Sequence, residues 1–113
     1  MAGKYNINAD QGSTFSFQFT MKTDGTAWNL TGYTARMQVR PDASSSTTYV
    51  SATTTNGYIA LGGVAGTVTV TIPASVMETV VSGKHVYDIE LVTGATVYRV
   101  LEGKFIVKQE VTR

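Results

Sequence analysis

The chain has 113 residues and a formal net charge of +1, with 42% hydrophobic and only 15% charged residues. This length fits one domain, so we expect residues 1–113 to form a single folded unit without room for a second. The small net charge gives no electrostatic basis for binding nucleic acid or an anionic membrane. The sequence has no cysteine, which excludes disulfides and cysteine-based metal sites.

Apolar and polar residues alternate along most of the chain, which is the pattern of strands with one buried face. In the first half, this alternation predicts strands around residues 4–10, 15–22 and 33–40. Pro41 ends the third strand because it has no N–H to donate to a ladder. Residues 42–48 are rich in serine and threonine, and we expect an exposed loop there.

The second half continues the same pattern. A weak, threonine-rich strand is predicted at residues 48–54 and is expected at the edge of a sheet. Further strands are predicted at residues 58–61, 67–72, 86–91 and 97–107. In the last of these the apolar residues change parity, and Gly103 stands between the two phases. A bulge or twist is therefore predicted at Gly103.

The one helix signal lies at residues 73–81. Ser75 is predicted to cap this helix, and Glu78 follows at the spacing of a capping box. Gly83 limits the helix to about two turns.

Together these elements predict an all-β fold, an immunoglobulin-like antiparallel β-sandwich of seven to nine strands with one short helix. Its core is expected to place Phe17 and Phe19 of one sheet against Met37, Ile89 and Leu91 of the other.

The sequence offers few groups for catalysis, and we expect the protein not to be an enzyme. His85 is the single histidine, at the start of a strand, where a surface or edge position is expected. The acidic residues form no defined pair, and the glycine-rich stretch at 62–66 lacks the lysine of a phosphate-binding loop. No catalytic, cofactor or metal site is expected, nor a small-molecule substrate.

Two predicted strands are candidates for pairing with another chain. The strand at 48–54 contains no lysine, proline or bulge, which are the usual blocks on an exposed edge. The first strand, at 4–9, could leave its own sheet and add to that of a neighbour. The candidate interface residues on these strands are Tyr5, Ile7, Tyr49, Val50 and Ser51.

A third candidate is a charged sheet face. Arg36 and Arg40 share one face of their strand, and Asp88 and Glu90 share one face of theirs. If the two strands are neighbours, these charges pair across the sheet. They are then either solvated pairs, each worth under about 1 kcal/mol, or part of a polar assembly face. We expect this charged face to contribute less to assembly contacts than the two candidate edge strands do.

Several segments of the chain resemble a known family. These are residues 10–15 (DQGSTF), 28–40 (WNLTGYTARMQVR), 57–63 (GYIALGG), 87–91 (YDIEL), 101–103 (LEG) and 110–113 (EVTR). They are similar to small tailed-phage virion proteins with an immunoglobulin-like fold, and to the N-terminal domain of phage upper baseplate proteins.

The resemblance implies a structural protein of the tail, baseplate or neck, made in the cytoplasm of the host bacterium and incorporated into the virion. Its expected partners are other virion proteins and further copies of itself, in an oligomer or a ring. Fold alone does not choose among the roles of such domains. One alternative is a capsid-decoration protein, and another is a module that binds carbohydrate or the host surface, with Tyr49, Tyr58 and Tyr98 as its candidate platform.

Overall fold

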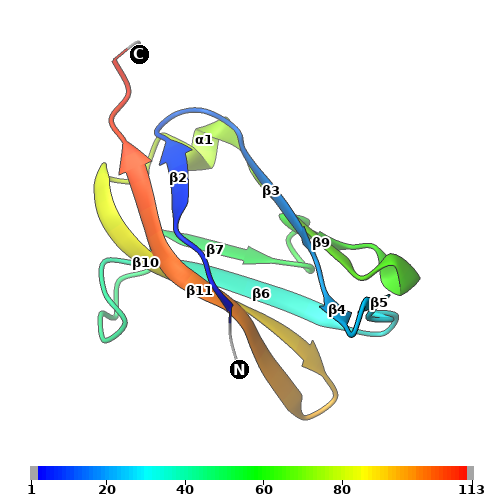
Figure 1. Cartoon of the computed structure of the whole chain (residues 1–113). Coiled ribbons are helices and arrows are strands. Elements are labelled where there is room, and N and C mark those ends of the chain that lie inside the picture. The colour runs from blue at the N-terminus through cyan, green and yellow to red at the C-terminus, as the bar shows by residue number, and fades with distance from the viewer. Residues whose placement is uncertain (1–2, 112–113) are drawn as a thin grey trace.

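The computed structural model describes residues 3–111, and most of their strands form two sheets that pack against each other (Figure 1). The larger sheet contains, in spatial order, β1 (Gly3–Lys4), β11 (Thr96–Lys108), β10 (Gly83–Thr93), β6 (Thr34–Arg40) and β7 (Val50–Thr53), with β2 (Ile7–Asp10) also paired to β11. The smaller sheet contains β3 (Phe15–Thr20), β9 (Thr67–Ile72) and β8 (Ile59–Leu61). A separate hairpin consists of β4 (Lys22–Thr23) and β5 (Thr26–Ala27). The predicted all-β sandwich is therefore confirmed.

Among the described residues there are eleven strands, and β1, β4 and β5 have only two residues each. The eight longer strands agree with the seven to nine that the alternation predicts. In β6 and β9 the alternation is complete, because every second side chain points into the space between the sheets.

The chain direction differs from the prediction at one edge of the larger sheet. β1 and β2 run parallel to β11, whereas all other described pairs are antiparallel. The chain leaves β2 for the smaller sheet instead of turning back beside it, so β2 and β3 do not pair. The first strand can therefore join β11 in the same direction.

The core lies between the sheets, but Phe17 and Phe19 are only half-buried at its margin. The expectation that both are buried is wrong, because β3 is an outer strand of the smaller sheet and these two side chains lie at the rim, although Phe15 of the same strand is buried. The central strand β9 supplies the fully buried residues of that sheet. Those with 0 or 1% of their surface exposed are Leu30, Met37, Val39, Ala52, Val68, Val70, Ile72, Met77, Val80, Ile89, Leu91 and Phe105.

The helix is shorter than predicted. Helix α1 spans Ala74–Met77, and its N-cap is Pro73, with no side-chain capping bond. Ser75 therefore lies inside the helix and does not cap it. The turn that follows brings Met77 and Val80 into the core, and a short 3₁₀ helix, η1 (Gly63–Ala65), connects β8 to β9.

The irregularity predicted at Gly103 lies three residues earlier. Ile89 pairs with Leu101 and Glu90 pairs with Arg99, so Val100 is the extra residue of a bulge in β11. Gly103 serves another purpose, because a Cβ atom there would overlap the Tyr5 carbonyl oxygen. The glycine allows the first strand to approach β11 closely.

Candidate assembly surfaces

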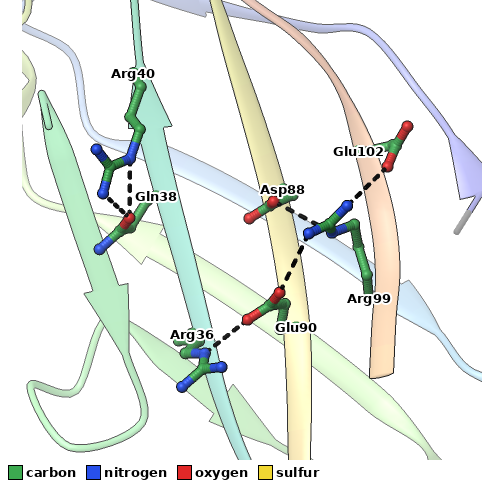
Figure 2. Close-up of polar contacts among 7 residues, drawn as sticks. All are labelled: Arg36, Gln38, Arg40, Asp88, Glu90, Arg99 and Glu102. Atoms are coloured by element: carbon green, nitrogen blue, oxygen red, sulfur yellow. Dashed lines mark hydrogen bonds and ion pairs between the residues drawn. The ribbon is translucent and has the colours of Figure 1, made fainter. Parts of the chain in front are cut away.

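The two strands that carry the predicted charges are neighbours, and their polar side chains form ordered contacts on the outer face of the larger sheet (Figure 2). We call this surface the ionic face. Arg36 on β6 lies directly opposite Glu90 on β10, and the Arg36 Nε atom is 2.7 Å from Glu90 Oε1. Arg99 reaches over β10 from the other side. The residues of the ionic face are Arg36, Gln38, Arg40, Asp88, Glu90, Arg99 and Glu102.

Arg99 is the centre of this network, although the sequence pattern did not single it out. Its guanidinium nitrogens lie 3.4 Å from Asp88, 3.7 Å from Glu90 and 4.0 Å from Glu102. Arg99 and Glu102 have opposite parity in the sequence, and the bulge at Val100 turns both to the same face. The only sequence signal for this was the mixed apolar phase of the last strand.

Arg40 takes a different partner from the one predicted. It lies opposite Val86 and forms no ion pair with Asp88 or Glu90. Its Nε and Nη2 atoms both donate to Gln38 Oε1, at 3.1 and 2.7 Å, and Nη1 donates to the Ser45 carbonyl at 2.6 Å. Arg40 therefore ties the 42–48 loop to the sheet and forms no ion pair within residues 3–111.

Asp88 lies at the middle of the ionic face. Burial raises the pKa of its carboxyl group, and the Arg99 guanidinium opposes this shift while Glu90 and Glu102 add to it. The side chain is still 40% exposed, so solvent screens these interactions.

The ionic face is concave beside Asp88. A hollow of about 580 Å³ lies between the start of the 42–48 loop and the first strand. Three cations at its margin, Lys4, Arg40 and Lys104, form no ion pair with any residue of 3–111. The hollow therefore has an excess of positive charge, in contrast to the nearly neutral chain. Its lining is Lys4, Asn6, Gln38, Arg40, Ala43, Val86, Tyr87, Asp88, Arg99, Glu102, Gly103 and Lys104.

The edge at β7 is positioned as predicted but is not open. β7 is the last strand of the larger sheet, and the Asn56 side chain from the following turn occupies its outer backbone groups. Asn56 Nδ2 donates to the Ser51 carbonyl at 2.9 Å, and Asn56 Oδ1 accepts from Thr53 N–H at 3.0 Å. Val50 is 2% exposed and belongs to the core, so its side chain is not available to a partner.

The first strand is also held in its own sheet. Tyr5 N–H donates to the Glu102 carbonyl at 2.9 Å, and the Tyr5 carbonyl accepts from the Tyr87 hydroxyl at 2.6 Å. Burial, together with nearby Tyr5, raises the pKa of Tyr87 to about 12. Ile7 is 3% exposed and fills the core, whereas Tyr5 is 53% exposed. Leaving the sheet would break these contacts, so strand exchange here is disfavoured.

The three candidate tyrosines of a carbohydrate platform do not lie together. The Tyr49 ring packs on His85 with centroids 4.6 Å apart, near the start of β10. Tyr98 pairs with Leu91 and packs edge-on against Trp28. His85 and Leu91 are six positions apart on one strand, which separates the two tyrosines by about 20 Å. Tyr58 is half-buried between β7 and β8.

His85 is buried, so the expected surface position is wrong. It is 6% exposed because it shares the inward parity of Tyr87 and Ile89. Its Nε2 atom lies 2.6 Å from the Val81 carbonyl, which can only accept, so Nε2 carries the proton. Within residues 3–111, no group of histidine and acidic side chains could hold a metal ion.

No protein-family model matches the chain, and no curated protein matches it significantly. In the part of the chain that the structure describes, no helix has the length and apolar character needed to cross a membrane.

Proposed function

We propose that the chain is a non-enzymatic assembly protein of a tailed-phage virion, in the tail, baseplate or neck, that docks on other virion proteins through its ionic face. The virion setting rests on the sequence segments that resemble phage proteins. The docking surface rests on the geometry of the larger sheet.

One observation carries the choice of the ionic face. Arg99 is held by carboxylates from β10 and β11, and Arg36 and Arg40 are each held by a partner on the same face. Side chains that are ordered before binding lose less conformational entropy when a partner arrives. The hollow adds a concave shape and an excess of cations that suits an acidic segment of a partner.

The edges of the larger sheet support the same choice. β7 is capped by Asn56, and the first strand is tied by Tyr87. The outer face is therefore available for binding, whereas the only open part of these edges is the segment of β11 before Leu101, which pairs with β10 alone among the described strands.

The experiment starts from a phage genome that carries the gene. The gene is deleted and supplied again from a plasmid as wild type, Arg99→Glu or Lys22→Glu. Particles are purified, separated into heads and tails, and analysed by mass spectrometry and electron microscopy. Lys22→Glu is the matched control because it reverses a charge on the β4–β5 hairpin, away from the ionic face.

We expect the wild type and Lys22→Glu proteins in the tail fraction, and Arg99→Glu protein to fold but to be depleted from particles. Far-ultraviolet circular dichroism of the purified variant checks folding. Recovery in the head fraction would instead support capsid decoration. Absence of the wild-type protein from all particles would refute the virion role, and normal incorporation of Arg99→Glu would refute docking through the ionic face.

A further inference from the structure

The smaller sheet has an edge that is not capped. β3 pairs with β9 on one side and with no other strand of residues 3–111. Thr71 N–H on β9 donates to the Tyr58 carbonyl beside β8. Backbone groups alternate in direction along an antiparallel strand, so the backbone groups of Val68, Val70 and Ile72 on β9 point toward β3. Their partners on β3 are Phe15, Phe17 and Phe19.

The residues that alternate with these phenylalanines therefore direct their backbone N–H and C=O groups outward, away from β9. Ser16, Gln18 and Thr20 form no hydrogen bond with the rest of the described chain on that side. All three are exposed. Charged residues, proline and bulges block most natural edges, and β3 contains none of them.

The sequence around this edge is symmetric about Gln18. Phe17 and Phe19 flank it, followed by the hydroxyl residues Ser16 and Thr20. A two-fold interface requires one surface that is complementary to itself. Antiparallel pairing of two β3 strands about Gln18 meets this requirement, because Ser16 then lies opposite Thr20 of the second copy and Gln18 lies opposite itself.

We propose that β3 pairs with β3 of a second copy of this chain, forming a two-fold dimer centred on Gln18. The two smaller sheets become one continuous sheet, and every outward N–H and C=O group of Ser16, Gln18 and Thr20 is bonded. A second copy suits this strand better than a charged partner does, because the edge is uncharged and meets its own copy without like charges in opposition.

The aromatic side chains beside the edge support the same occupant. The rings of Tyr5, Phe17 and Phe19 stack in a row, with centroid distances of 5.5 Å and 5.7 Å between neighbours. Tyr5 is 53% exposed, and Phe17 and Phe19 are half-buried. In the dimer, Phe17 lies opposite Phe19 of the second copy, so pairing extends this apolar row across the junction. The proposal does not depend on the virion role.

The two-fold axis allows a charge-exchange test. Gln18→Glu places two carboxylates opposite each other, and Gln18→Lys places two ammonium groups opposite each other. Each variant alone should dimerise more weakly, whereas an equal mixture should form a heterodimer. Ala60→Glu is the matched control, because Ala60 is exposed in the same cross-strand row at the far edge of the sheet.

Sedimentation velocity from low to high micromolar concentration measures the mass of each sample. Wild type and Ala60→Glu should approach twice the 12.1 kDa chain mass. The dimer dissociation constant of each single Gln18 variant should rise about fivefold at low salt. In the wild type, amide hydrogen exchange at Ser16, Gln18 and Thr20 should slow as concentration rises.

Three results would overturn the proposal. These are a wild-type protein that stays monomeric at high concentration, Gln18 variants that dimerise as the wild type does, and an Ala60→Glu variant that alone loses the dimer. Failure of this test leaves the virion experiment unaffected, because that experiment measures incorporation into particles.

Discussion

The close approach of the first strand to Gly103 makes Gly103→Ala a sharp test of the structure. The φ angle of Gly103 is not in the left-handed region, so alanine suits the local backbone. Its Cβ atom would nevertheless overlap the Tyr5 carbonyl oxygen and crowd the Asn6 side chain. The contacted Tyr5 atoms belong to the backbone and cannot rotate away as a side chain can, so the first strand must shift from β11.

The cost follows from the bonds that this shift breaks. These are Tyr87 Oη to the Tyr5 carbonyl at 2.6 Å, Tyr5 N–H to the Glu102 carbonyl at 2.9 Å, and Lys104 N–H to Asn6 Oδ1 at 3.1 Å. At about 1 kcal/mol net for each bond, the loss is roughly 3 kcal/mol. Alanine restricts the unfolded chain and returns about 0.5–1 kcal/mol. The free energy of unfolding should therefore fall by about 2 kcal/mol.

Denaturant unfolding followed by the fluorescence of Trp28, the single tryptophan, measures this change. Gly3→Ala is the control, because a Cβ atom there meets nothing closer than Leu101 Cδ1 at 3.5 Å. Tyr87→Phe should cost about 1 kcal/mol in the wild type and much less in the Gly103→Ala background, since the shift has already broken its bond. Equal stability of Gly103→Ala and Gly3→Ala would refute the reasoning.

Three further predictions concern the core, the β7 edge and the ionic face. Phe105→Ala should lower the free energy of unfolding by ~3–5 kcal/mol, because Phe105 is fully buried. Half-buried Phe17→Ala should cost only ~1–2 kcal/mol, and a larger loss at Phe17 would contradict this order. Asn56→Ala should cost ~1–2 kcal/mol in denaturant unfolding and speed aggregation in light scattering, because it uncaps β7. Asn29→Ala, which also removes a turn-forming amide, should not speed aggregation. The pKa of Asp88 is higher in the folded chain than in the unfolded chain. The stability linked to this shift is fully present at pH values below the unfolded pKa, and it is lost as the pH rises through the folded pKa. Asp88→Asn should therefore gain stability relative to the wild type between acidic and neutral pH, and the opposite trend in unfolding titrations would contradict the burial of Asp88.

The strands and one pairing of the ionic face could be predicted because a half-buried strand imposes a period of two on its sequence. β6 and β10 both show this period clearly, which places Arg36 and Glu90 on outward faces. Their adjacency then follows from the sandwich fold. The helix was less predictable, since Pro73 occupies the cap position that the capping-box spacing assigned to Ser75.

Parity arguments fail where a strand gains a residue. β11 is regular on both sides of Val100, but the extra residue moves Arg99 onto the face of Glu102. A mixed apolar phase shows that an irregularity exists, and it does not show where. The backbone places the irregularity at Val100 and leaves Gly103 for the contact with Tyr5.

The state of a sheet edge is harder still to predict, because it depends on residues outside the strand. β7 has no lysine or proline, yet Asn56 in the next turn occupies its outer groups. β3 alternates phenylalanine with polar residues, and this pattern predicts Phe17 and Phe19 in the core. Alternation reports that one face is buried, and it does not report how many strands lie alongside. A strand such as β3 can therefore bury its phenylalanines partly and still present Gln18 to a second copy. For this reason, we expect pairing at β3, although its sequence pattern does not indicate an exposed edge.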